Sequence, residues 1–144
     1  MQTPNILFLM TDQQRCDAMG CAGNRHLATP NLDTLAGSSI RFHNAVTPTP
    51  VCVAARMSLI TGQRASCTHW VANHRLPGPT PEFPTIMTLL QRAGYWTQGI
   101  GEMHFSGRMH GLRNLLSMEE GPAHLVDDDY RRYLLDHGVR TRFP

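Results

Sequence analysis

The sequence predicts an α/β fold, on two main observations. Residues 5–10 are predicted as a strand, since the continuous apolar run at 6–10 is typical of a strand buried on both faces of a parallel sheet. Short runs of this kind then alternate with segments of helical periodicity, which is the element order of an α/β layer fold. A chain of 144 residues can bury a core of its own. Three clear strands are few for a complete sheet, so we expect this chain to be part of a larger domain.

The first strand is expected to end in polar residues where chemistry is often found. Asp12 and Gln13 follow residues 5–10 directly, at the carboxyl end of the predicted strand. Ligands of open α/β sheets bind at that edge. The alternative is that the two side chains only cap a following helix.

The next elements are predicted by helix boundary signals. Thr29 is a candidate N-cap, Pro30 fits the first helical position, and Gly37 fits the end of that helix. Residues 40–46 are predicted as a second strand. The alternating Thr and Pro residues at 47–50 then interrupt regular structure.

The second half is predicted to hold three helices and one more strand. One helix runs from Val51 to Gly62, and another opens at Pro84 with apolar residues at 86, 89, 90 and 93 before Gly94. Residues 95–101 are predicted as a strand, and residues 105–123 as a long surface segment without clear period. The aspartates at 127–129 are placed at the start of a last helix, which ends at residue 138.

Bulk composition excludes some classes of function. The formal net charge is only +2 and no long run of one sign is present, so no nucleic-acid partner is indicated. The apolar run at residues 6–10 is too short to cross a membrane, and no charged segment precedes it as in a signal peptide. Cys16, Cys21, Cys52 and Cys67 include no Cys-x-x-Cys pair. We therefore expect a cytoplasmic location, with the cysteines other than Cys52 packed in the protein.

Cys52 and Arg56 lie four residues apart at the start of a predicted helix, so they share one face of its first turn. The helix dipole and a guanidinium together favour binding of a tetrahedral oxyanion such as a sulfate or phosphate ester. A cysteine in this position could be a nucleophile, a redox thiol or a target of modification. The structural alternative is a buried small side chain beside a surface arginine.

Four motifs resemble those of the formylglycine-dependent sulfatases, and they occur along the chain in the order expected for that family. Cys-Val-Ala-Ala-Arg at residues 52–56 continues into Leu-Ile-Thr-Gly at 59–62. Asn-Ile-Leu at 5–7 precedes Asp-Gln at 12–13, and Thr-Pro-Asn-Leu-Asp occupies 29–33. Ala-Gly-Tyr-Trp-Thr at 93–97 leads to Gly-Glu-Met-His at 101–104. The resemblance implies a three-layer α/β/α sheet of the alkaline phosphatase-like superfamily, with residues 1–144 as the N-terminal portion of its catalytic domain.

By this resemblance, Cys52 is oxidised by a formylglycine-generating maturation enzyme, and the hydrated aldehyde attacks a small sulfate ester. A divalent cation, by similarity Ca²⁺, would take ligands from Asp12, Gln13 and modified Cys52. Arg56 and His104 would be the other catalytic residues. Asn73 is a substrate-binding candidate, and the alternative for Asn73 is a structural role. The alternative for His104 is a loop histidine with no catalytic role.

Glu102 departs from the family pattern, which has a lysine in contact with sulfate oxygens at this position. A carboxylate there repels an anion, by roughly 4 kcal/mol for unit charges about 4 Å apart at an effective dielectric near 20. On charge alone, Glu102→Lys should raise turnover of an aryl sulfate. The alternative is that the Glu102 side chain points away from the substrate or serves another ligand.

We therefore expect a sulfuric ester hydrolase that is incomplete and inactive as the isolated chain, because further metal ligands of the family come from beyond such a segment. The nearest alternative is a phosphonate monoester or phosphodiester hydrolase of the same superfamily. A second alternative is a non-catalytic remnant that keeps the fold and binds an anion or another chain. Self-association would favour this second alternative.

Overall fold

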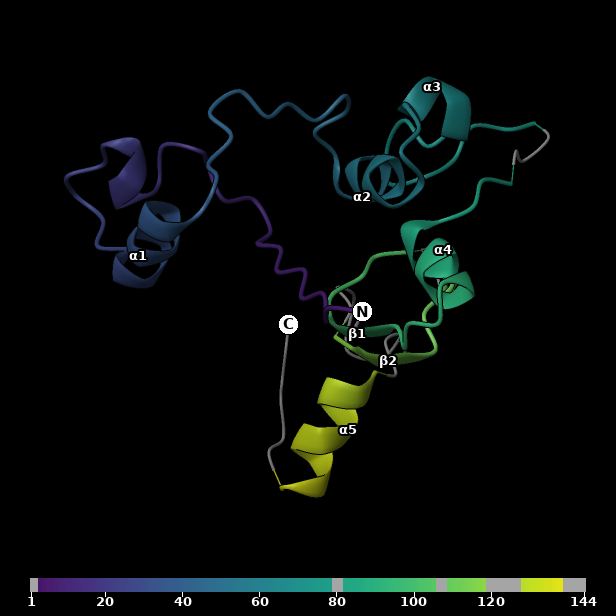
Figure 1. Cartoon of the computed structure of the whole chain (residues 1–144). Coiled ribbons are helices and arrows are strands. Elements are labelled where there is room, and N and C mark those ends of the chain that lie inside the picture. Colours follow the sequence, from purple (N-terminus) through teal and green to yellow (C-terminus); the bar gives the residue numbers. More distant parts are fainter. Residues whose placement is uncertain (1–2, 79–81, 106–108, 119–127, 139–144) are drawn as a thin grey trace. The chain divides into compact units, whose positions relative to one another are not determined.

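A computed structural model of the chain describes residues 3–78, 82–105, 109–118 and 128–138 (Figure 1). The chain divides into two compact units, residues 1–45 and residues 46–144. Across the described ranges, every helix is too short or too polar to traverse a bilayer.

The first unit is built around a polar cluster between two short helices. These are the 3₁₀ helix η1 (Gly20–Ala22) and helix α1 (Pro30–Ser38). The Thr29 hydroxyl accepts a hydrogen bond from the Gly20 N–H at 2.8 Å and donates to the Asp33 carboxylate at 3.0 Å. Asp33 also accepts from the Cys21 N–H at 2.6 Å. Pro30 begins α1 as predicted, but the Thr29 side chain joins the two helices instead of capping α1.

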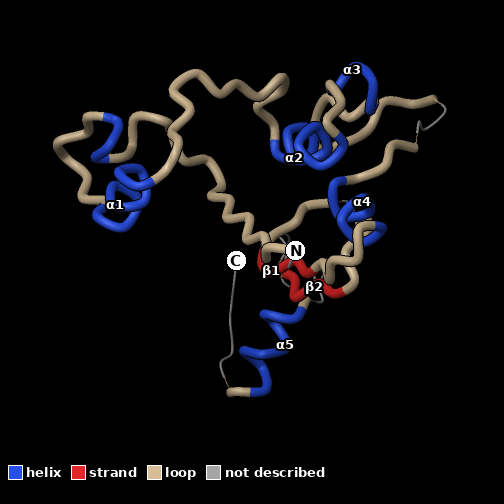
Figure 2. Tube along the Cα trace, in the orientation of Figure 1, coloured by secondary structure: helices blue, strands red, loops and turns tan. Residues whose placement is uncertain are grey.

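The two strands predicted in the first unit are not formed. Residues 5–10 and 40–46 have no regular structure, and Figure 2 draws both as loop. Leu7 and Leu9 are 82% and 80% exposed. A strand needs hydrogen bonds to a neighbour, and the described part of this unit contains no strand that could provide them. The apolar pattern identified segments suited to a sheet, but the sheet itself is missing around them.

Helix α2 (Cys52–Thr61) is the centre of the second unit and matches its predicted bounds. Val53, Met57 and Ile60 lie on one face of it and are at most 7% exposed. They pack against Phe105, with partly buried side chains around them from Trp70, Met87, Met103 and Leu112. Gly62, with φ of 67°, ends the helix in the left-handed region as the sequence predicts. The short helix α3 (Ala65–Thr68) follows.

A small parallel sheet forms beside these helices. Strand β1 (Gln98–Gly101) pairs with β2 (Asn114–Ser117), with Gln98 opposite Asn114 (Figure 1). The prediction of surface structure at 105–123 is therefore wrong at residues 114–117. These two strands are the whole sheet in the described ranges, so the α/β class is observed while a three-layer arrangement is not.

Helix α5 (Asp129–Asp136) packs on β2 through hydrogen bonds from its first turn. The Asp129 carboxylate accepts from the Ser117 N–H at 2.9 Å. Asp128 is the N-cap and accepts from the Arg131 N–H at 2.8 Å. The predicted helix start at 128–129 is thus confirmed, while position 127 of that prediction lies outside the described residues.

Helix α4 (Ile86–Arg92) holds the loop that leads into β2. Gln91 donates to the Gly111 carbonyl and to the Thr97 hydroxyl, and Thr97 donates to the same carbonyl at 3.0 Å. Gly111 has φ of 91°, and a Cβ there would lie 2.8 Å from the backbone nitrogen of Thr88. The approach of this loop to α4 therefore requires glycine.

We predict that Gly111→Ala destabilises the protein more than Gly94→Ala, which is its matched control. Gly94 also has positive φ, at 90°, but open space surrounds it. Gly94→Ala should therefore cost only the backbone strain, about 1–2 kcal/mol. Gly111→Ala should cost about 1–3 kcal/mol more because the new methyl group is forced against α4. Urea unfolding measures both, and equal losses would contradict the close approach.

Candidate active site

The first turn of α2 carries Cys52, and a distant residue caps it. Cys52 is the first residue of the helix and is partly exposed. Val51 is the N-cap but makes no side-chain cap. Instead, the Asn73 side-chain oxygen accepts from the Val53 N–H at 3.1 Å. Asn73 thus lies beside the turn that carries Cys52. Its contact with Val53 is structural, which is the alternative role that the sequence offered for Asn73.

The second part of the site is the segment that follows β1. Gly101 has φ of 100° and His104 has φ of 50°, so the chain turns sharply after the strand ends. Glu102 and His104 are brought to the carboxyl end of β1 by this turn, with side chains 16% and 26% exposed. This is the edge at which ligands bind in α/β folds.

Arg56 joins the two parts. Its side chain is only 7% exposed, and Nη1 donates to the backbone oxygen of Glu102 at 3.0 Å. The same nitrogen lies 3.1 Å from the Glu102 Oε1 atom, which in turn lies 3.3 Å from His104 Nδ1. Both side chains are largely buried, so water screens this ion pair weakly and the contact constrains the site.

The structural alternative for Arg56 is therefore wrong in one respect. Arg56 does lie on the helix that begins with Cys52, but it is buried and is not the surface arginine of the structural alternative. Its contact with Glu102 was missed because the two residues are 46 positions apart. The sequence did contain one signal of this contact. Glu102 is a carboxylate at a position where the family pattern has a lysine, and a carboxylate there implies a cationic partner.

Asp12 and Gln13 belong to the first unit, and both are exposed. Cys52 belongs to the second unit. Over the described ranges, no three His, Cys, Asp or Glu side chains gather as a metal site. The donor chemistry nevertheless suits Ca²⁺, since Asp12 and Gln13 offer oxygens and a modified Cys52 would offer another. The metal assignment stays a prediction.

The other cysteines are free thiols. Cys16 and Cys67 are exposed, so the prediction that they pack in the protein is wrong. Cys21 is partly buried against the Asp33 cluster of the first unit, as predicted.

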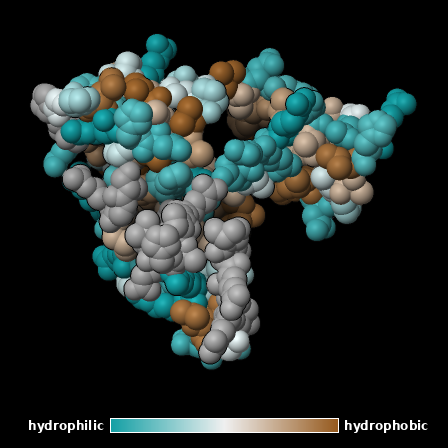
Figure 3. Space-filling model, turned by 180° about the vertical axis from the view of Figure 1, so that it is seen from behind, coloured by the Kyte–Doolittle hydropathy of each residue, from teal (hydrophilic) through white to brown (hydrophobic). Residues whose placement is uncertain are grey.

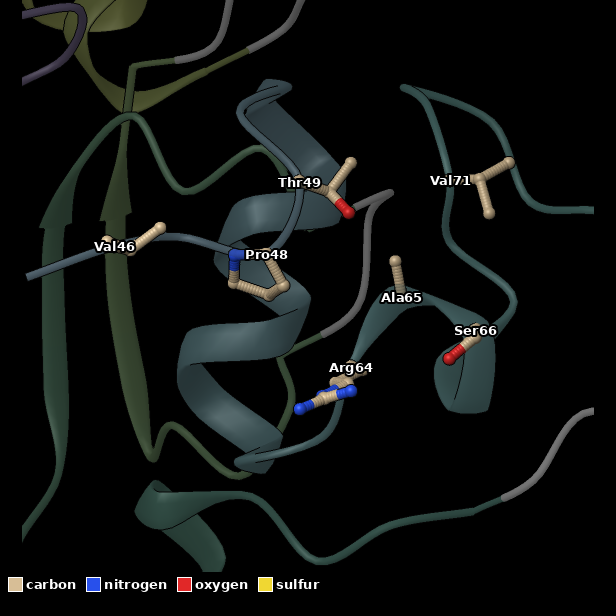
Figure 4. Close-up of a pocket in the computed structure, with 7 residues that line it drawn as sticks. All are labelled: Val46, Pro48, Thr49, Arg64, Ala65, Ser66 and Val71. Carbon is tan, nitrogen blue, oxygen red and sulfur yellow. The ribbon is translucent and has the colours of Figure 1, made fainter.

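A separate cavity of about 720 Å³ lies in the second unit (Figure 4). It is formed by the segment that leads into α2 and by the start of α3 and the loop after it. Its lining residues are Val46, Pro48, Thr49, Arg64, Ala65, Ser66 and Val71. The lining is mostly apolar, with the Arg64 guanidinium as its cationic group, and it includes neither Glu102 nor His104.

Comparison with known proteins decides the family. The family model described as Sulfatase matches residues 4–138, which is nearly the whole chain. The chain belongs to the sulfatase family. It is 36% identical over 125 residues to an arylsulfatase of Clostridium perfringens, which covers 85% of this chain and 26% of that protein.

Two further sulfatases show the same extent of similarity. A choline-sulfatase of Rhizobium meliloti is 38% identical over 132 residues, or 90% of this chain and 25% of that protein. An N-acetylglucosamine-6-O-sulfatase of Bacteroides thetaiotaomicron is 31% identical over 144 residues, or 96% of this chain and 25% of that protein. The chain thus spans about a quarter of the length of these sulfatases, and it corresponds to their N-terminal part.

We predict that Asn73→Ala destabilises the second unit by about 1 kcal/mol, because the Val53 N–H then loses its acceptor. Asn73→Asp is the matched control, since it keeps an acceptor and adds negative charge near a helix N-terminus. Urea unfolding of both variants gives the comparison. Equal losses for Ala and Asp would show that the cap contributes nothing.

Proposed function

We propose that this chain is the N-terminal portion of the catalytic domain of a sulfuric ester hydrolase, with a formylglycine formed from Cys52 as its nucleophile. Family membership and the position of Cys52 as the first residue of α2 support the proposal. The first turn of a helix favours an anion, and Arg56 fixes that helix to the end of β1, where Glu102 and His104 lie.

The reaction proceeds by a displacement at sulfur followed by an elimination of sulfate. One hydroxyl of the hydrated aldehyde attacks the sulfur, its oxygen–sulfur bond forms, and the ester oxygen leaves as an alcohol with a proton. The second hydroxyl then loses its proton, the carbon–oxygen bond to sulfate breaks, and the aldehyde is restored. Water adds to the aldehyde and re-forms the diol for the next cycle. A bound divalent cation supplies positive charge that favours loss of the first hydroxyl proton.

The residues of this chain have separate parts in that scheme. Asp12, Gln13 and residue 52 would hold the cation through oxygen atoms. Arg56 keeps the residue-52 turn in place, and His104 lies near the transferred group. Asn73 sets the geometry of the same turn from outside the helix through its bond to Val53.

We predict that Cys52→Ala in the full-length protein reduces aryl sulfate turnover by at least about a thousandfold, because the nucleophile is lost. Cys67→Ala is the control, since Cys67 is an exposed free thiol outside the site, and it should leave turnover unchanged. Peptide mass measurement should show residue 52 changed by a sulfur-for-oxygen exchange and the loss of two hydrogens. An unmodified Cys52 in active protein would contradict the mechanism.

We predict that EGTA abolishes turnover in the full-length protein and that added Ca²⁺ restores it, because the nucleophile depends on the cation. Asp12→Asn should raise the Ca²⁺ concentration needed for restoration by about tenfold or more, since a charged ligand is replaced by a neutral one. Activity unaffected by EGTA, or equal Ca²⁺ requirements, would argue against Asp12 as a ligand.

Assays with phosphonate monoesters and phosphodiesters, run beside aryl sulfates, test the nearest alternative. A preference for the phosphorus esters would favour a phosphonate monoester or phosphodiester hydrolase of the same superfamily over a sulfuric ester hydrolase.

The exposed apolar residues at 6–10 favour a different alternative, a non-catalytic remnant that associates through this stretch. Apolar side chains also reach the surface elsewhere, on the face drawn in Figure 3. Size-exclusion chromatography together with the sulfate assay separates the two hypotheses. An inactive, self-associating full-length protein would favour the remnant.

A further inference from the structure

We propose that Glu102 is a positioning residue, which holds Arg56 and His104 in a single cluster at the carboxyl end of β1. This inference rests on the proposed function and adds to it a role for the residue that departs from the family pattern. Glu102 is then neither a contact to the sulfate nor a charge that repels it.

The geometry is that of a bridge. The Glu102 Oε1 atom lies 3.1 Å from Arg56 Nη1 and 3.3 Å from His104 Nδ1. The backbone oxygen of Glu102 accepts from the same Arg56 nitrogen at 3.0 Å. Arg56 therefore contacts both the main chain and the side chain of one residue, which fixes the α2 helix relative to the turn after β1.

Burial makes the bridge energetically significant. The Arg56 and Glu102 side chains are 7% and 16% exposed, so water screens their attraction far less than it would at the surface. His104 Nδ1 lies 3.3 Å from the Glu102 Oε1 atom without hydrogen-bond geometry, so the carboxylate limits the space open to the ring by contact. Glu102 thus restrains both the helix that carries Cys52 and the ring of His104.

This arrangement reverses the expectation from charge alone. In Glu102→Lys, an ammonium would be forced beside the buried Arg56 guanidinium, and the cluster would be driven apart. Glu102→Gln keeps the size of the side chain and the backbone acceptor but removes the negative charge. Glu102→Asp keeps the charge on a shorter side chain.

Kinetics of the full-length protein with an aryl sulfate test the role. Glu102→Gln should lower kcat at least tenfold with KM changed less than threefold, because catalytic groups are misplaced while little substrate binding is lost. Glu102→Asp should recover part of kcat, and Glu102→Lys should be at least as impaired as Gln. Glu82→Gln, a change at an exposed glutamate, is the control and should behave as wild type. A rise in kcat/KM for Glu102→Lys would overturn the proposal.

A double-mutant cycle on unfolding tests the bridge without any activity. Arg56→Met and Glu102→Gln should each raise the unfolding equilibrium constant, and their effects should be non-additive by at least tenfold, since each removes the partner of the other. Additivity within twofold would overturn the bridge. If the wild-type protein turns over no ester, the proposed function is what fails, and the cycle still decides whether Glu102 holds Arg56.

Discussion

The contact between Arg56 and Glu102 is the constraint on which the site depends. A guanidinium that is 7% exposed must have its charge balanced, and Glu102 provides both a carboxylate and a carbonyl oxygen. Because Arg56 belongs to α2 and Glu102 follows β1, meeting this need also sets the position of Cys52 relative to the strand end. The apolar core of Val53, Met57, Ile60 and Phe105 stabilises the same junction, because Phe105 from the segment after β1 packs against α2.

Local signals in the sequence were sufficient for the longer helices, whereas the short helices η1 and α3 were not predicted. The Gly62 stop and the apolar spacing of α2 are properties of the segment itself, so its bounds could be predicted without knowledge of the fold. Strands depend on partners, and only the strand predicted at 95–101 was formed, as β1. Residues 5–10 have strand character but no neighbour in the described ranges, whereas Asn114–Ser117 have only two apolar residues and became a strand because β1 lies beside them.

The candidate site, like the fold, was predicted only in part from the sequence. Placement of Cys52 and Arg56 on one helix follows from their spacing, and the resemblance to sulfatases named His104 and Asn73. The contacts could not be predicted, because Arg56 meets Glu102 across 46 residues and Asn73 meets Val53 across 20. Sequence spacing gives the side chains that one helix presents, while the partners of those side chains depend on how distant segments pack.

The backbone at His104 adds a restriction of another kind. With φ of 50°, this position lies in the left-handed region, which glycine, asparagine, aspartate and histidine tolerate better than most residues. Glycine or asparagine there would preserve the path of the loop but remove the imidazole. A glutamine or lysine would bring a polar side chain but strain the backbone. The conformation of the main chain and the chemistry of the side chain therefore favour different substitutes at residue 104. Few single substitutions at this position can satisfy both requirements during evolution.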